Sequence, residues 1–323
     1  MKRWPYLMII VGAALWGIIG VFVQGLYDLG FTAFQVLTIR AVSAAILLVS
    51  YVYFTNRDLL KIKPRDCTYF ISMALFSVVF FNWCYFTAIG EVPMSVAAVL
   101  LYTAPAFVTI LSRIFFKEAM TKRKIIALMT TFIGTTLVIG YLPQGAQGVS
   151  ALGFWAGIGS GIGYGLYSII GKVALDRYDT LTITTYTFVF ASIFVFPFSG
   201  IWQNSVALTQ TMTWIYILGL GSFPTAVAYI LYTRGLSYVE SSKASITATV
   251  EPVVATIVGI IIFGERLTYW QLLGIILVLM AIYIVQGKEK DIKEDVEENT
   301  YEEELIKKAE GVEKSQIQED TGQ

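Results

Sequence analysis

The sequence predicts an all-α membrane protein with ten transmembrane helices, arranged as two inverted five-helix repeats. Three observations predict this fold class: a low content of charged residues, a succession of long apolar segments, and a similarity between the two halves of the chain. Charged residues make up 14% of the 323 residues, whereas soluble globular proteins contain about 25%. A soluble core of this size could not keep its surface hydrated with so few charges, so we expect the chain to span a membrane.

The apolar segments predict the individual helices. A bilayer core requires about 20 mostly apolar residues in each spanning helix. Lys2 and Arg3 precede the first segment as in a signal peptide, but no clear cleavage site follows, so we expect an uncleaved first helix. The ten predicted spans are residues 6–25, 34–54, 68–89, 94–116, 125–141, 152–171, 181–200, 212–231, 244–263 and 269–285.

The basic residues of the short connections predict the orientation of these helices, because Lys and Arg accumulate on the cytoplasmic side. Fourteen basic residues lie at the N-terminus and in the connections on the same side, against one, Arg266, in the alternate connections. This bias indicates an even number of spans with both termini in the cytoplasm. The absence of organellar targeting features favours the bacterial plasma membrane, where the protein would be a multi-pass protein.

The two halves of the chain resemble each other. A shift of 147 residues aligns positions 85–140 with 232–287 without a gap and gives 13 identical pairs. Chance can match apolar residues such as Val and Ile, but it rarely matches Pro and Glu as well. An odd number of spans in each copy requires the copies to insert in opposite senses. The identical pairs include Pro105/Pro252 and Glu118/Glu265.

This similarity predicts the domain organisation. Residues 1–141 form the first five-helix repeat and residues 152–287 form the second. Residues 288–323 form an acidic cytoplasmic tail that we expect to be mostly disordered, because it is charge-dense and has no long apolar face. A regulatory role for the tail stays open. The net charge is +7 in residues 1–287 and −7 in the tail, which gives zero for the chain.

Composition excludes several classes of function. The chain has no His and only two Cys, which argues against a metal site, and no cofactor is expected. The basic residues are scattered over short connections, so no nucleic-acid interface is predicted. An intramembrane enzyme such as a lipid transferase would require a catalytic cluster at an interface, and the few loop carboxylates do not supply one. We therefore expect a non-enzyme whose partners are a small molecule and the lipid bilayer.

Two prolines are predicted to bend helices. Pro105 and Pro252 fall near the middle of the fourth and ninth spans. A proline inside a helix removes a backbone hydrogen bond and bends the helix, and in lipid the freed carbonyl needs a neighbour or water in a cavity. Repeat transporters bind their substrates at this depth. Bending for helix packing alone is the alternative.

Two charged residues lie within the predicted spans. Glu251 is about eight residues, or about 12 Å, inside the ninth span. A carboxylate in that position is costly unless it is protonated, paired or hydrated, so Glu251 is predicted to carry protons or to bind a substrate amine, with a structural hydrogen bond as the alternative. Arg40 could bind a substrate carboxylate, pair with Glu251, or extend toward the outer headgroups.

Other polar and aromatic side chains are predicted near the same depth. Trp16 and Tyr164 occupy equivalent places when the halves are shifted by 148 residues, so they could face one pathway. Tyr and Trp also gather at membrane interfaces, which is the alternative for such residues. The full set of candidate substrate-binding residues is Trp16, Arg40, Asn82, Tyr102, Tyr164, Tyr167, Thr249 and Glu251.

Several sequence motifs of this chain resemble those of a known family. The second half reads Glu251-Pro252-Val253-x-Ala255, then Gly259, Gly264-Glu265-Arg266-Leu267 and Gln271-x-x-Gly274. This string resembles the C-terminal signature of the EamA family within the drug/metabolite transporter superfamily. The first half resembles it more loosely, and Ala104 stands where the second half has Glu251. The resemblance covers about residues 1–287.

The resemblance implies a ten-helix secondary transporter that works by alternating access. Several members export amino acids or related metabolites, so export of such compounds across the plasma membrane is the expected function. A carrier for sugars, nucleosides or drugs, or a non-transporting membrane sensor, stays open as an alternative. Coupling to protons through Glu251 is a hypothesis, and the substrate, the direction of transport and the oligomeric state are left open.

Overall fold

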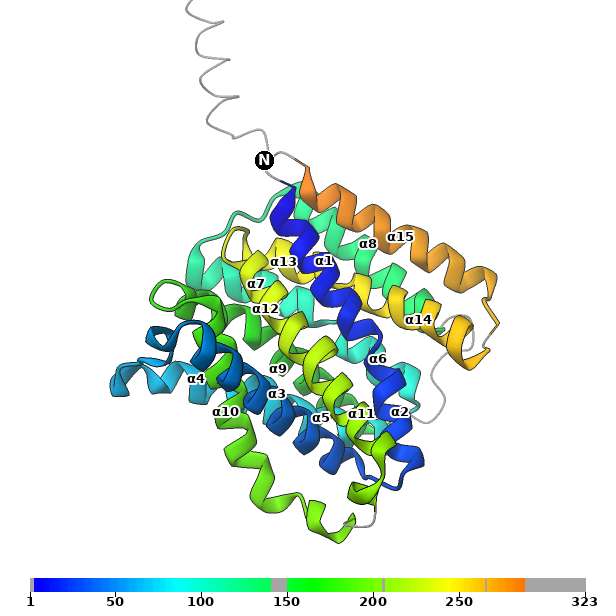
Figure 1. The fold of residues 1–323 in the computed structure, drawn as a ribbon. Helices are drawn as coiled ribbons and strands as arrows, with labels where there is room; N and C mark the ends of the chain where they lie inside the picture. Colours follow the sequence, from blue (N-terminus) through cyan, green and yellow to red (C-terminus); the bar gives the residue numbers. More distant parts are fainter. Residues whose placement is uncertain (1–2, 141–149, 205–206, 265, 288–323) are drawn as a thin grey trace, which may run out of the picture. The chain divides into compact units, whose positions relative to one another are not determined.

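The computed structural model describes residues 3–140, 150–204, 207–264 and 266–287, and within them every regular element is a helix (Figure 1). Residues Lys2–Gln286 form one compact unit. The predicted tail, residues 288–323, lies outside the described residues.

The helices of each half follow the order predicted from the apolar segments. Those of the first half are α1 (Trp4–Gly17), α2 (Ile19–Asp28), α3 (Ala33–Thr55), α4 (Cys67–Ala74), α5 (Phe81–Glu91), α6 (Met94–Leu101), α7 (Ala104–Phe116) and α8 (Lys122–Val138). Those of the second half are α9 (Ala151–Leu175), α10 (Thr180–Val195), α11 (Thr211–Gly221), α12 (Ala228–Leu236), α13 (Ser241–Ala248), α14 (Val250–Phe263) and α15 (Tyr269–Gln286). Short 3₁₀ turns lie in the connections after α3 and α10.

Eight helical stretches in the described part of the chain are long and apolar enough to cross a membrane. Several of them combine two helices, such as α1 with α2 and α13 with α14, into one stretch. Two predicted spans do not meet these criteria: α8 has 17 residues, and α9 has 25 residues, many of them glycine or polar. The chain is therefore an all-helical, multi-pass membrane protein.

The two halves share local irregularities, and the members of each pair are 147 residues apart. Six-residue π-helical stretches, which are rare and often mark functional sites, occupy Leu75–Phe80 and Ser222–Val227. The long stretches 94–116 and 241–263 are interrupted at Tyr102 and at Thr249. The helices that follow these breaks end at Lys117 and Gly264, both with left-handed backbone. This spacing equals the shift that aligns the sequences of the two halves.

Contacts between the halves follow the same pattern. The helix α1 packs against α12 and α14, and its counterpart α9 packs against α5 and α7. The helix α3 packs against α10, and α8 lies alongside α15, as Figure 1 shows. Each half therefore buries its helices mainly against the other half, and the core lies between them.

The predicted prolines lie beside the helix breaks. Pro105 is in the first turn of α7, and Pro252 is the third residue of α14. The interruption comes before each proline rather than at it, because a proline is well tolerated in the first turn of a helix, where the backbone N–H has no helical partner. The sequence predicted a bend at each proline, whereas the structure has a new helix starting just before it.

Glycines allow α8 and α15 to approach closely, as small residues do between membrane helices. A Cβ atom placed on Gly274 would lie 2.6 Å from the backbone nitrogen of Val138 and 2.7 Å from the carbonyl oxygen of Gly134. These neighbours are backbone atoms, so they cannot move aside as a flexible side chain can.

We expect Gly274→Ala to lower the thermal stability of the purified protein, by about 1–3 kcal/mol, because the added methyl group overpacks the contact. The matched control is Gly90→Ala, since a Cβ at Gly90 in α5 meets no atom within 4 Å. Thermal unfolding in detergent measures both. Equal melting temperatures for the two variants would contradict this account of the α8–α15 contact.

Candidate functional site

A cavity of about 410 Å³ lies between the two halves. Its walls come from α1, α2, α3, α5 and α6 of the first half and from α9, α12 and α14 of the second. Most of the lining is apolar or aromatic. Six of the eight predicted substrate-binding residues line it: Trp16, Arg40, Asn82, Tyr102, Tyr164 and Glu251.

The other two predicted residues, Tyr167 and Thr249, are not among the residues that line the cavity. The Tyr167 hydroxyl is buried and shares a 2.8 Å hydrogen bond with the Thr233 hydroxyl. The Thr249 hydroxyl donates to the carbonyl oxygen of Ile246, one turn back, at 2.6 Å. Both predictions rested on depth alone, and the structure shows that these side chains satisfy their polar groups within the helix packing instead.

Glu251 is held at the start of α14, next to the break at Thr249. The Tyr164 hydroxyl donates a 2.9 Å hydrogen bond to its Oε2 atom. Tyr102, at the equivalent break of the first half, also lines this part of the cavity. The broken helix thus presents a carboxylate to the cavity rather than to lipid, and a tyrosine from the second half orients it.

Arg40 supplies the positive charge of the cavity. Its Nε atom donates to the Thr225 hydroxyl at 3.1 Å, and its guanidinium carbon lies 5.7 Å from the ring centroid of Tyr229. Thr225 belongs to the π-helical stretch of the second half and donates to the carbonyl oxygen of Leu220 at 2.7 Å. The π-helical stretch therefore places an acceptor opposite the arginine.

Arg40 and Glu251 do not form an ion pair with each other, since no N–O distance between them is within 4.0 Å. In this structure Arg40 therefore does not make the direct contact with Glu251 that is one of the three roles considered for it. Its bond to Thr225 and its place over Tyr229 also direct it into the protein rather than toward the headgroups. The cavity thus holds two opposite charges at separate places.

Asn82 lies just after the π-helical stretch of the first half. Its side-chain amide donates to the carbonyl oxygen of Val78 at 2.7 Å. This carbonyl also accepts from the backbone N–H of Phe81, so the amide of Asn82 is its second donor. Asn82 lines the cavity, and one of the two N–H groups of its side-chain amide is used in supporting the helix.

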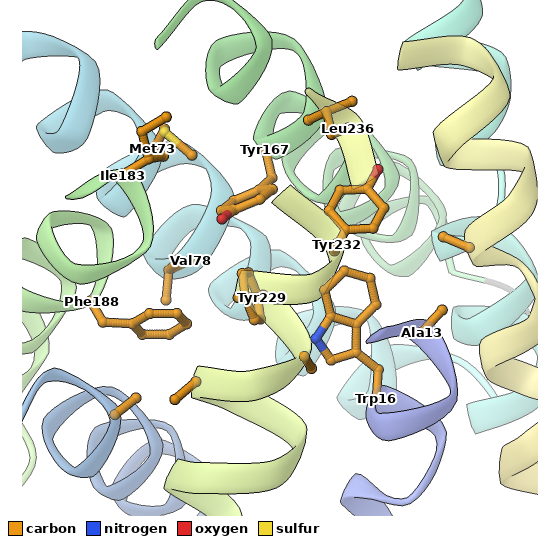
Figure 2. Close-up of a cluster of buried hydrophobic side chains, with 14 of the residues drawn as sticks. Ala13, Trp16, Met73, Val78, Tyr167, Ile183, Phe188, Tyr229, Tyr232 and Leu236 are labelled. Atoms are coloured by element: carbon orange, nitrogen blue, oxygen red, sulfur yellow. The ribbon is translucent and has the colours of Figure 1, made fainter. Parts of the chain in front are cut away.

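Aromatic rings of the second half pack around Trp16 of the first half (Figure 2). Their centroids lie 5.1 Å from Trp16 for Tyr229, 5.0 Å for Tyr232 and 6.0 Å for Tyr164. Such tilted and edge-to-face pairs contribute about 0.5–1.5 kcal/mol each beyond their buried area. The indole nitrogen of Trp16 faces Tyr229 in Figure 2 and has no hydrogen-bond partner. The cluster forms a rigid wall between the cavity and the core.

Among the residues of this site that sequence reasoning did not find are Phe81, Tyr229 and Thr225. Phe81 and Tyr229 line the cavity, and Thr225 holds Arg40. The internal repeat carried a usable signal, because the shift of 147 residues aligns Tyr229 with the predicted residue Asn82. Thr225 had no such signal, since its role depends on a π-helical stretch that the sequence pattern does not reveal.

The described residues contain no group of three or more His, Cys, Asp or Glu side chains arranged to hold a metal ion. Glu251 is the one carboxylate among the residues that line the cavity. The chemistry available there is therefore that of a single carboxylate, a guanidinium, hydroxyl groups and aromatic faces.

Comparisons with known proteins agree with this architecture. An "Uncharacterized transporter" of Archaeoglobus fulgidus is 29% identical over 292 residues, which cover 89% of this chain and all of that protein. The "Uncharacterized transporter YyaM" of Bacillus subtilis is 23% identical over 252 residues, covering 76% of this chain and 81% of that one. A solved crystal structure has the same fold, with a TM-score of 0.71 at 14% identity over 88% of this chain and 97% of its own.

The model of the EamA-like transporter family matches the chain over residues 3–140 and 151–286. These two segments include all the residues that line the cavity. The resemblance noted in the sequence motifs is thereby confirmed: the chain belongs to the EamA-like transporter family.

Proposed function

We propose that this protein is a secondary transporter that moves small metabolites, foremost amino acids or related compounds, across the plasma membrane by alternating access. The observation that carries the proposal is the cavity between the two halves, with Arg40 and Glu251 at separate places in an aromatic wall. An apolar cavity with a few fixed polar groups is the usual form of a small-molecule site.

The proposed topology has ten spans as two inverted five-helix repeats. Added to the eight stretches that meet the criteria for a membrane span, α8 and α9 give five spans in each half. The paired π-helical stretches, helix breaks and left-handed helix ends support a repeat. An odd number of spans per repeat requires opposite insertion. The bias of basic residues supports a cytoplasmic location for both termini.

The charges of the cavity support a zwitterionic substrate. A substrate carboxylate would bind the terminal guanidinium nitrogens of Arg40, because the Nε atom is already engaged by Thr225. A substrate ammonium group would bind Glu251, and an apolar side chain would pack on rings such as Phe81. Sugars and nucleosides lack this pair of charges, so they fit the site less well.

Counterflow with the purified protein in lipid vesicles tests the substrate class. We expect accumulation of a radiolabelled apolar or aromatic amino acid when the vesicles are preloaded with the same unlabelled compound, and none of a labelled sugar. Accumulation of the sugar alone would support a transport function but contradict amino acids as the substrate class. Absence of exchange for amino acids, sugars, nucleosides and cationic drugs would contradict a transport function.

Arg40→Met should weaken binding of the substrate carboxylate. A hydrogen bond to a charged group contributes about 1.5–3 kcal/mol, so we expect KM for an amino acid to rise about tenfold or more. The KM for the corresponding amine, which lacks the carboxylate, should stay within about twofold. Competition of unlabelled compounds in the counterflow assay measures both constants, and a similar rise for the two compounds would contradict this role.

Glu251 is proposed to couple transport to protons. In Glu251→Gln, uptake driven by a pH gradient should fall at least tenfold, while counterflow without a gradient should persist. The matched control is Glu91→Gln, because Glu91 is an exposed carboxylate that accepts a hydrogen bond from Ser150 at the end of α5. An uptake rate that does not depend on the pH gradient, in the parent protein and in Glu251→Gln, would contradict proton coupling.

A further inference from the structure

The cavity reaches the protein surface at one end of the helices. Tyr27, near the end of α2, and Met94, at the start of α6, both line the cavity, and they are 40% and 66% exposed. Ile89, near the end of α5, and Ala33, at the start of α3, line it at the same end. The connections here belong to the set that is poor in Lys and Arg.

The opposite ends of the helices are joined by a buried group of charges, where the connection α7–α8 meets the connection α12–α13. The Lys124 ammonium lies 3.0 Å from a carboxylate oxygen of Glu240 and 3.6 Å from one of Glu118. The same oxygen of Glu240 lies 2.9 Å from the Lys243 ammonium. The side chain of Lys124 is only 1% exposed, which is rare for a lysine.

Glu118 ties the first half of the chain to the start of α13. Its carboxylate accepts hydrogen bonds from the backbone nitrogens of Ser241 at 2.8 Å and Ser242 at 3.3 Å, and from the Ser242 hydroxyl. A carboxylate at a helix N-terminus satisfies free N–H groups and interacts favourably with the helix dipole. The helix α13 leads directly to the break at Thr249 and to Glu251. A movement of α13 away from Glu118 would therefore shift the break at Thr249 and the position of Glu251 in the cavity.

We propose that Glu118, Lys124, Glu240 and Lys243 form a latch that keeps the basic-loop end of the transporter closed while the cavity is open at the other end. Release of this latch opens the basic-loop end during the transport cycle. The proposal rests on the proposed function, since a latch of this kind has a role only in alternating access.

Energetic reasoning favours a conformational role over a purely stabilising one. Burying an ion pair removes both charges from water, and this desolvation cost is often larger than the attraction between the charges. Buried ion pairs therefore contribute little to stability. Lys124 lies between two carboxylates, and without it Glu118 and Glu240 would repel each other across the contact between the halves. The ammonium thus makes the ion-paired part of the contact depend on Lys124, while Ser241 and Ser242 bond Glu118 directly.

The internal repeat keeps the counterpart of Glu118 but not the other residues that form ion pairs in the latch. The residues 147 positions from Glu240, Lys243 and Lys124 are Pro93, Val96 and Gln271. These three side chains carry no charge, so they cannot reproduce the ion pairs at the other end. The difference favours the state in which the basic-loop end is closed, which is the state of this structure.

Other bonds at the same end join neighbouring helices and connections. The Lys172 ammonium on α9 donates to the carbonyl oxygens of Leu236 and Val239, each at 2.7 Å. Asp66, between α3 and α4, is buried and accepts bonds from Arg177 at 3.0 Å and Tyr178 at 2.7 Å. These bonds hold neighbouring connections together, but Lys124 is the buried cation that joins α8 to the connection before α13.

The charge state of the latch supports this reading. Burial would raise the pKa of Glu240, but the ammonium groups of Lys243 and Lys124 outweigh it and hold the pKa of this carboxyl below its usual value of 4.5. A lowered pKa means that the carboxylate stabilises the closed end above pH 4.5 and loses this effect as pH falls through the lowered pKa. The Glu240 carboxylate of the latch is therefore charged near neutral pH.

Accessibility of a buried reporter cysteine tests the proposal without any substrate. In a background with Cys67 and Cys84 replaced by Ser, Ser245→Cys places a thiol on α13, where Ser245 is 3% exposed. A membrane-impermeant maleimide is applied to the protein in lipid vesicles. We expect Lys124→Met to speed labelling at least tenfold, and Lys124→Arg to restore slow labelling because it returns the charge.

The matched control is Lys61→Met at the same end, because Lys61 forms an exposed ion pair with Asp58 at 2.7 Å and is 80% exposed. Glu118→Gln, which keeps the shape of the side chain and removes its charge, is the second variant and decides the matter if Lys124→Met aggregates on size-exclusion chromatography. Labelling of the latch variants no faster than that of Lys61→Met overturns the proposal.

Counterflow of the same proteins separates this proposal from the proposed function. Fast labelling of Lys124→Met together with an absence of transport in the parent protein would support a movable closure and contradict the transport function. Slow labelling of both latch variants together with active transport would overturn the latch and leave the transport function standing.

Discussion

The structure depends on one constraint: within a bilayer no water is available to satisfy backbone groups that leave the regular helical pattern. Irregular backbone is therefore tolerated only where protein or an aqueous cavity replaces the lost partners. In this chain the π-helical stretches and the helix breaks lie toward the interface between the halves. Side chains add hydrogen bonds there: Asn82 donates to the carbonyl oxygen of Val78, and Thr225 donates to that of Leu220.

The same irregularities place the charged groups of the cavity. The break at Thr249 leaves Glu251 in the first turn of α14, where Tyr164 of α9, in the same half, donates a hydrogen bond to it. The wider turn at Ser222–Val227 presents Thr225 to Arg40. Tyr164 on α9 donates to Glu251, and Thr225 of the π-helical stretch accepts from Arg40, so each buried charge has a hydrogen-bonding partner. The repeat gives the two halves a similar helical framework. Their chemistry differs because Ala104 of the first half aligns with Glu251 of the second.

Much of the fold could be predicted from the sequence, because long apolar segments, charge bias and the repeat are all expressed in residue order. The two matches to the family fall close to the predicted halves. In the site, Trp16, Arg40 and Glu251 could be predicted from the sequence, because charged or large polar residues stand out within an apolar span. Thr225 and Lys124 could not be predicted in this way. The role of Thr225 depends on a local change in helix pitch, and Lys124 resembles an ordinary loop lysine until folding brings Glu240 to it.

The central claim is that the two ends of the cavity open in alternation. Double electron–electron resonance between spin labels measures this directly, with one pair at Met120 and Tyr238 on the basic-loop side and a second pair at Asp28 and Glu91 on the other, all exposed positions. On addition of saturating substrate, the account predicts a population in which the first distance lengthens while the second shortens. Distances that stay fixed, or that lengthen together, would contradict it.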